Sequence, residues 1–168
     1  MTDDDQAAPE TEIETTAESA IDERLVTSTY PVVELETCEV RLSREWTYPG
    51  RCLVIPTEQY RDIHEMPGED FLLMMGEVRF VTGVLARLYK ADKMNVASFG
   101  NMVPWLHWHI IPRRTGDTAW PATPWENPGP PVDADEETLA DHAERISWAL
   151  LDAEFEDGDD DAEEDGTA

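Results

Sequence analysis

Two histidines, His107 and His109, lie two positions apart within the apolar residues 105–111. Side chains alternate between the two faces of a β-strand, so a strand over these residues would place both imidazoles on one face, together with Trp105. A neutral imidazole can act as a nucleophile, and a hydrogen bond at one ring nitrogen decides which nitrogen it presents. The spacing therefore indicates two reactive or ligating side chains on one rigid element.

Neutral hydrogen-bond donors precede the histidines. A second strand-like run, residues 94–99, contains Asn95, and the turn after it contains Gly100 and Asn101. The two amides can donate to an anion, and a glycine allows the backbone to approach a ligand closely. A histidine nucleophile among neutral donors suits attack on a phosphate ester or anhydride, in which positioning and charge stabilisation do most of the work.

Two other interpretations of the histidine pair remain open from the spacing alone. His-x-His on a strand is half of a typical metal site, but such a site needs a third ligand, and Cys38 and Cys52 lack CxxC spacing. A sheet can also bury two hydrogen-bonded histidines that have a purely structural role. Phosphate chemistry, metal binding and structure are about equally compatible with the spacing.

The elements that must position these residues follow from hydrophobic periodicity. Partial alternation in residues 32–42 predicts one or two strands, and residues 51–56 predict a short apolar strand. Apolar residues recur at intervals of three and four in residues 69–90, which predicts one long helix that is apolar on more than one side. The prolines of residues 115–131 predict an extended arm, and residues 135–151 predict a final helix. We therefore expect an α+β fold with a C-terminal arm and helix.

Acidic residues dominate both ends of the chain. The sequence has 38 acidic and 12 basic residues, with nine of the acids in residues 1–23 and ten in residues 152–168. These segments are poor in aromatic residues, so we expect a disordered N-terminal tail over residues 1–24, a domain over 25–151 and a disordered tail over 152–168. The acid excess, with only two lysines, favours adaptation to high salt over an ordinary acidic surface.

The composition also argues against several partners and locations. No basic stripe is present to meet a nucleic-acid backbone, and no apolar run approaches the length of about 18 residues that spans a membrane. The acidic N-terminus resembles neither a signal nor a transit peptide, and two cysteines in unrelated contexts give no disulfide framework. We therefore expect a cytoplasmic protein that binds neither nucleic acid nor membrane.

A resemblance to the histidine triad (HIT) superfamily is carried by the segment VPWLHWHIIPR, which is similar to the family's three histidines separated by apolar residues. The upstream segments KMNVASFGN and PGRCLVIPTEQYRDIHEM are similar to the strands, phosphate-binding turn and helix entry of that family. The segment GDTAWPATPW resembles the tail of one bacterial and archaeal branch. The family's first histidine falls on Trp105, and an acidic residue that many members use to bind ribose falls on Ser43.

The resemblance implies an HIT-like fold, an antiparallel sheet crossed by the long helix, in a homodimer packed through that helix. It implies hydrolysis or nucleotidyl transfer at a nucleotide α-phosphate, without metal or cofactor. Candidate substrates are dinucleoside polyphosphates, nucleoside phosphoramidates and related adenylates. The alternatives are a nucleotide-binding module with little catalysis and a His-x-His metal-binding protein.

The resemblance also assigns roles to residues. His107 would be the nucleophile that forms a covalent nucleotidyl-histidine, and His109 a second catalytic residue. The phosphate would be bound by Asn95, Gly100 and Asn101. The region around the nucleoside would include Ser43, Trp46 and Trp105.

Overall fold

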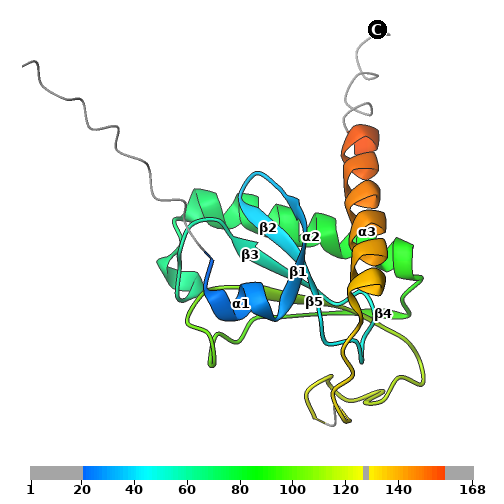
Figure 1. Ribbon diagram of the computed structural model, residues 1–168. Coiled ribbons are helices and arrows are strands. Elements are labelled where there is room, and N and C mark those ends of the chain that lie inside the picture. The colour runs from blue at the N-terminus through cyan, green and yellow to red at the C-terminus, as the bar shows by residue number, and fades with distance from the viewer. Residues whose placement is uncertain (1–20, 127–128, 158–168) are drawn as a thin grey trace, which may run out of the picture.

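The computed structural model describes residues 21–126 and 129–157, which form one sheet with helices around it (Figure 1). The elements, in chain order, are α1 (Glu23–Thr27), β1 (Thr29–Glu34), β2 (Cys38–Ser43), β3 (Cys52–Pro56), the 3-10 helix η1 (Ile63–Glu65), α2 (Gly68–Tyr89), β4 (Lys93–Ala97), β5 (Trp108–Arg113) and α3 (Glu136–Asp157). This order confirms the α+β class, with one long helix followed by a C-terminal arm and helix.

The five strands form an antiparallel sheet in the order β1-β2-β3-β5-β4. Its central strands β2, β3 and β5 are buried along nearly all of their length. His109 on β5 lies between Leu53 on β3 and Ala97 on β4. The sheet therefore holds His109 from both sides.

β5 begins at Trp108, so the predicted strand over residues 105–111 is three residues too long at its start. Pro104 has no backbone N–H, and the N–H of Leu106 donates to the carbonyl of Tyr60 in a loop, at 2.7 Å. The chain joins the sheet only where Trp108 pairs with Val54. His107 therefore immediately precedes the strand that carries His109.

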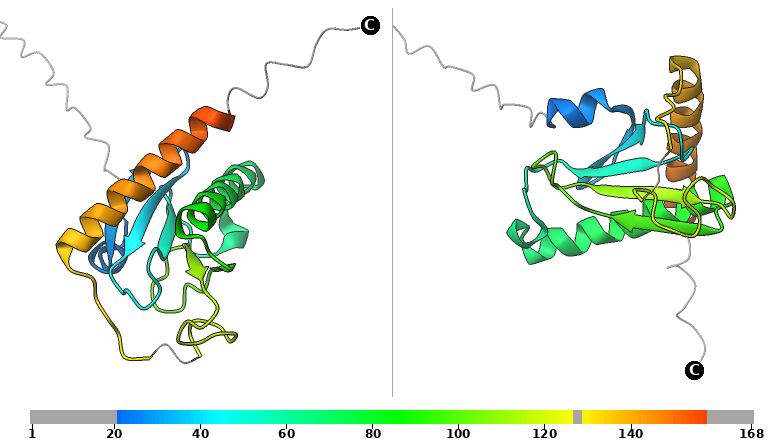
Figure 2. Two further views of the ribbon diagram at one scale, coloured as in Figure 1. Left: turned by 90° about the vertical axis from the view of Figure 1, so that its right-hand side faces the viewer. Right: turned by 90° about the horizontal axis from the view of Figure 1, so that it is seen from below.

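One hydrophobic core is shared by α2, α3 and one face of the sheet. Figure 2 shows α1 and α2 on opposite sides of the sheet, with α3 crossing near one end of it. A second, smaller cluster lies under α1 and consists of Leu25, Leu53, Ile55 and Trp105. Because α2 and α3 cover one face, the other face is free to carry the site.

The long helix α2 begins after Pro67 and ends where Lys90 turns into the left-handed conformation, with φ 49°. The predicted bounds of 69–90 differ from these by one residue at each end. Leu72 and Leu73 on its outer side are 71% and 51% exposed. The helix is thus apolar beyond the face that packs on its own domain, as its sequence predicts.

Two helical segments extend beyond the prediction. α1 was not predicted and includes residues 23 and 24 of the predicted N-terminal tail. The Asp22 carboxylate caps this helix by accepting the N–H of Arg24 at 2.9 Å. α3 continues to Asp157, past the predicted end at residue 151, so residues 152–157 of the predicted C-terminal tail are helical. The rest of that tail and residues 1–20 lie outside the described residues.

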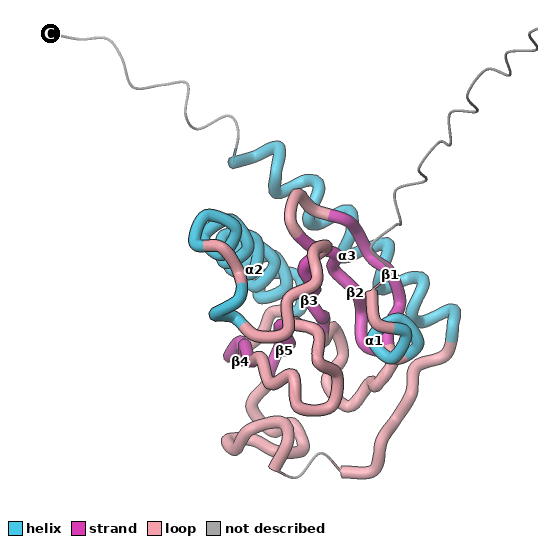
Figure 3. Tube along the Cα trace, turned by 90° about the vertical axis from the view of Figure 1, so that its left-hand side faces the viewer, coloured by secondary structure: helices cyan, strands magenta, loops and turns pink. Residues whose placement is uncertain are grey.

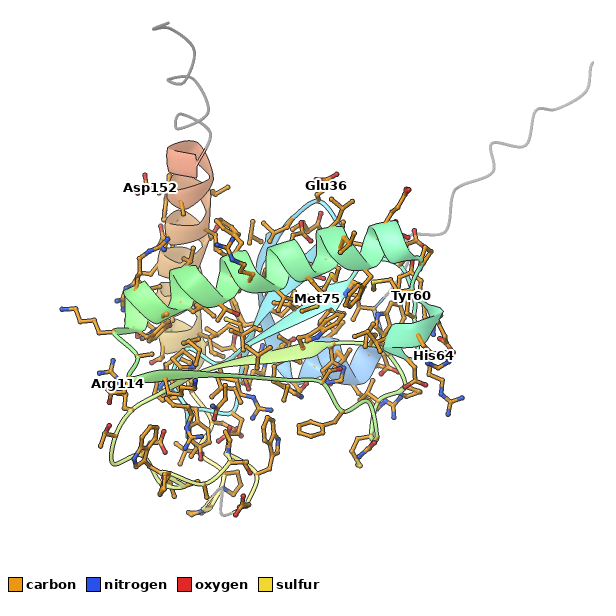
Figure 4. The ribbon with its side chains drawn as sticks, turned by 180° about the vertical axis from the view of Figure 1, so that it is seen from behind. Glu36, Tyr60, His64, Met75, Arg114 and Asp152 are labelled. Carbon is orange, nitrogen blue, oxygen red and sulfur yellow. The ribbon has the colours of Figure 1, made fainter. Side chains whose placement is uncertain are left out.

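Most loop segments, pink in Figure 3, lie on the side of the sheet away from α2. Residues 98–107 connect β4 to β5 at one end of the sheet, whereas the arm leaves β5 at the other end and returns to bring Trp125 against Phe99. In Figure 4, Tyr60 and His64 lie by the N-terminal end of α2, and Arg114, at the start of the arm, lies by its other end. None of the helices within residues 21–126 and 129–157 combines the length and apolarity needed to cross a bilayer. The cytoplasmic location stays a prediction.

Candidate functional site

The imidazoles of His107 and His109 lie side by side, with ring centroids 4.9 Å apart and ring planes at 86°. Both line a cavity of about 570 Å³ on the face of the sheet opposite α2. The prediction that the two histidines share one face is therefore correct, although only His109 belongs to β5.

His107 carries its proton on Nδ1. This nitrogen lies 2.7 Å from the backbone carbonyl of Trp105, and a carbonyl can only accept a hydrogen bond. Burial lowers the pKa of His107, the Trp105 carbonyl partly opposes this shift, and the nearby Arg51 cation adds to it. The imidazole is therefore neutral at neutral pH and keeps an unshared pair on Nε2, as a nucleophile requires.

His109 has the opposite arrangement. Its Nδ1 lies 3.1 Å from a terminal nitrogen of Arg51, and a guanidinium can only donate. Burial, followed by the charges of Arg51 and His107, lowers the pKa of His109 to about 3. The neutral ring must then carry its proton on Nε2, so His109 is a hydrogen-bond donor where His107 is an acceptor.

Polar and apolar groups line the cavity around the histidines. Backbone and polar groups come from Ser43 at the end of β2 and from the Gly100-Asn101 turn, where Gly100 has φ 67°. Apolar side chains include Leu25 from α1 and Leu53 from β3. The arrangement brings the histidines, the turn and Ser43 to one cavity, as predicted.

Two aromatic side chains form a further part of the lining. Phe99 and Trp125 meet edge to face, with ring centroids 4.7 Å apart, and Trp125 lies 5.6 Å from the ring of His109. The rings are 53% and 37% exposed. Trp125 belongs to the arm after β5, so the arm completes the cavity.

Arg113 at the end of β5 fixes this arm. The side chain of Arg113, which is 2% exposed, donates to both oxygens of Asp117, at 2.6 and 2.7 Å, and to the carbonyl of Ala122, at 3.2 Å. The guanidinium also lies over the rings of Tyr48 and Trp120. The ion pair lowers the pKa of Asp117, so the carboxylate stays charged in this half-buried place.

Three predicted site residues lie outside this cavity. Asn95 uses its carbonyl oxygen to accept from Arg113, at 2.6 Å, and so supports the arm. Trp46 packs edge-on against His142, on the α3 side. Trp105 is 6% exposed and donates its indole N–H to the carbonyl of Pro56, at 3.4 Å.

The lining also includes four residues that were not predicted from the sequence: Arg51, Glu45, Phe99 and Trp125. Arg51 could have been suspected, because it stands directly before five apolar residues and after a Pro-Gly turn. Gly50 has φ 84°, and a Cβ there would lie 2.4 Å from the Tyr89 ring, so the turn that delivers Arg51 requires glycine. Trp125 gave no local signal, because its place depends on the path of the arm.

A metal site would need further ligands beside the histidines. Within the part of the chain that the structure describes, no three His, Cys, Asp or Glu side chains gather at one point. The chemistry open to the site is that of a neutral nucleophile, a neutral donor and an arginine.

Comparisons with known proteins agree with this geometry. The HIT domain model matches residues 25–116. The chain is 35% identical to a histidine triad protein from Marinobacter aquaeolei VT8, with a TM-score of 0.73 over 79% of this chain and 96% of that one. The chain is 28% identical to a histidine triad protein from Sinorhizobium meliloti 1021, with a TM-score of 0.71 over 79% of this chain and 95% of that one.

A more distant structure shares the fold alone. Plasmodium falciparum diadenosine triphosphate hydrolase is 16% identical, with a TM-score of 0.59 over 79% of this chain and 80% of that one. No curated protein matches the chain. The family match and the structural relatives, together with the paired histidines on their sheet, show that this chain belongs to the histidine triad (HIT) family.

Proposed function

We propose that this protein hydrolyses or transfers a nucleotide at its α-phosphate through a covalent nucleotidyl-histidine on His107. The observation that carries the proposal is the opposite protonation of two adjacent imidazoles. His107 offers an electron pair, and His109 offers an N–H beside it. A nucleophile next to a fixed donor is what attack on a phosphate diester or anhydride needs.

The reaction runs in two steps. Nε2 of His107 attacks phosphorus, the bond to the leaving group breaks, and the nucleotidyl group is held on His107. The N–H of His109 and the Gly100-Asn101 turn donate to the non-bridging oxygens. Water or another acceptor then attacks phosphorus, the P–N bond breaks, and neutral His107 is restored.

The nucleoside has a place beside the histidines. Leu25 and Leu53 offer apolar surface to a base, and Ser43 offers a hydroxyl to the ribose. Dinucleoside polyphosphates, nucleoside phosphoramidates and adenylates share these parts. The Plasmodium protein with this fold is a diadenosine triphosphate hydrolase.

The test uses His107→Ala and His109→Ala with diadenosine tetraphosphate in molar potassium chloride. His107→Ala should abolish turnover while nucleotide binding survives, because it removes the attacking atom. His109→Ala should lower the rate by about 10²–10³, as loss of one donor to the phosphate does. Quenched reactions with labelled nucleotide should give an acid-labile protein adduct in the wild type and none in His107→Ala.

A nucleotide-binding module with little catalysis is the second candidate. It is favoured by Trp105, which is buried and uses its N–H within the protein, where the family has its first histidine. Tight nucleotide binding by a wild type that gives neither turnover nor adduct would establish this alternative. An active His107→Ala enzyme would refute the covalent mechanism.

We also propose a homodimer formed through α2 and the edge strand β4. Leu72 and Leu73 on α2 are largely exposed, and Val96 on β4 is 43% exposed. An edge strand with apolar side chains is a ready surface for a second copy. Light scattering at micromolar protein in molar salt should give twice the chain mass, and Leu72→Glu with Leu73→Glu should give the monomer.

A further inference from the structure

We propose that Arg51 stabilises the negative charge on the leaving group, and that the enzyme therefore acts on substrates whose leaving group departs as an anion. This inference rests on the proposed function. It concerns the step that a covalent histidine mechanism leaves open. When phosphorus parts from the leaving atom, that atom takes the electron pair and must be either protonated or stabilised as an anion.

The cavity has no side chain suited to supply that proton. The titratable groups of its lining, in the part of the chain that the structure describes, are Glu45, Arg51, His107 and His109. His107 attacks through Nε2, and its N–H is held by the Trp105 carbonyl. His109 is neutral, since burial lowers its pKa to about 3, and a neutral imidazole is a very weak acid.

The other candidates for a proton donor are also occupied. The Glu45 carboxylate accepts the N–H of Thr47 on one oxygen, at 2.9 Å, and faces Arg51 with the other. Trp105 cannot act, because it is buried and donates to the Pro56 carbonyl. An amine or alkoxide leaving group would find no acid here.

The charge of Arg51 is only partly compensated, and not all of its N–H donors are used. Its side chain is 16% exposed, yet the carboxylate of Glu45 lies 3.4 Å away, longer than the usual 2.7–2.9 Å of a charge-assisted bond. Its Nε–H is buried without a hydrogen-bond partner among the described residues. A half-compensated, desolvated guanidinium of this kind favours an anion beside it.

Arg51 lies in the cavity lining next to His109. One of its terminal nitrogens donates to His109, which in the proposed reaction holds a non-bridging oxygen of the attacked phosphate. The guanidinium also lies 5.8 Å from the centre of the Trp125 ring, at the aromatic part of the cavity. The charge of Arg51 is thus one hydrogen bond from the group that meets the reacting phosphate.

The step balances without an acid. Nε2 of His107 bonds to phosphorus, the P–O bond breaks, and its electron pair leaves with the oxygen of a phosphate or carboxylate anion next to Arg51. Water then takes the nucleotidyl group from His107 and releases one proton to solvent. Anhydrides, in which the nucleotide is joined to a phosphate or a carboxylate, meet this condition, whereas phosphoramidates do not.

The experiment measures how the rate depends on the acidity of the leaving group. Wild type, Arg51→Met, Arg51→Lys and Arg145→Met are compared on aryl esters of adenosine 5′-phosphate with phenols of graded acidity. Diadenosine tetraphosphate and adenosine 5′-phosphoramidate complete the set. Arg145 is 51% exposed on α3 outside the cavity, so its variant is a matched control.

In the wild type, kcat/KM should fall steeply as the phenol becomes less acidic. The value of kcat/KM for diadenosine tetraphosphate should exceed that for adenosine 5′-phosphoramidate by about 100-fold or more. Arg51→Met should steepen the slope and lower diadenosine tetraphosphate turnover by about 10²–10³, with partial recovery in Arg51→Lys. Arg145→Met should match the wild type.

Two results would overturn the inference while leaving the proposed function intact. One is equal wild-type turnover of anhydride and phosphoramidate. The other is an Arg51→Met enzyme that loses the same factor on every ester, because a residue that only orients His109 would act on all of them alike. A wild type without turnover or adduct on any substrate would refute the proposed function, and this inference with it.

Discussion

Replacement of Arg113 by methionine tests whether one buried arginine holds the arm that completes the cavity. Arg113 is 2% exposed and makes a bidentate pair with Asp117, as well as bonds to Asn95 and Ala122. Methionine fills part of the volume but removes the guanidinium that pairs with the Asp117 carboxylate and donates to the Asn95 oxygen. Breaking such a buried pair costs about 3–5 kcal/mol.

A loss of this size should lower the melting temperature by roughly 10–20 °C for a domain of this length. The assay is calorimetry in molar potassium chloride, with amide hydrogen exchange of residues 114–126 to detect release of the arm alone. The double variant Arg113→Met, Asp117→Asn should recover part of the loss, since no charge is then left unpaired. Exposed Arg145→Met is the control; an Arg113→Met protein that melts within 2 °C of it, with exchange in the arm unchanged, would refute the reasoning.

Four further predictions concern pH, the turn before Arg51, and salt. The lowered pKa of His107 keeps the nucleophile neutral, so kcat should stay level down through pH 6.5 and fall only below it; an acid limb centred at about 6.5 would contradict the burial of this ring. Both buried histidines bind protons more readily when the chain is unfolded, so the free energy of unfolding should decrease as pH falls below about 6.5, in a urea titration at several pH values. Gly50→Ala should destabilise by about 2–4 kcal/mol, because its Cβ would overlap the Tyr89 ring at a positive φ, whereas Gly116→Ala, also at positive φ but with open space around it, should cost only about 1–2 kcal/mol. The net charge of −26 repels itself at low ionic strength, so the melting temperature should rise between about 0.1 M and 2 M potassium chloride; no change would count against adaptation to high salt.

Local pattern was enough to predict the framework of the site. The periodicity of residues 69–90 placed the long helix to within one residue, and the alternation around His107 and His109 placed both rings on one face. These features depend on side chains a few positions apart, whose relative directions the backbone period fixes. The turn at Gly100 and Asn101 could be predicted for the same reason, since it directly precedes the histidine segment.

Residues brought in by distant segments could not be predicted this way. Asn95 is predicted to donate to the phosphate, and its contact with Arg113 from the end of β5, which binds the amide oxygen, had no signal in the sequence. Trp46 is predicted to lie near the nucleoside, but its ring packs against His142 of α3, on the opposite face of the sheet. In both cases the partner lies more than fifteen residues away, and only the folded chain brings it into contact.

Trp105 and Arg51 both bear on the fate of the leaving group. Trp105 fills a buried place under α1 with its N–H already used, so this position offers substrate no proton. Arg51, which directly precedes β3, instead brings a permanent charge next to the rings of His109 and Trp125. A charge that cannot be lost stabilises an anion at any pH, whereas a histidine acid acts only where it is protonated. A buried Trp105 that offers no proton and an Arg51 that offers a permanent charge both suit a leaving group that departs as an anion, and the change of slope between wild type and Arg51→Met in the aryl ester series tests this chemistry.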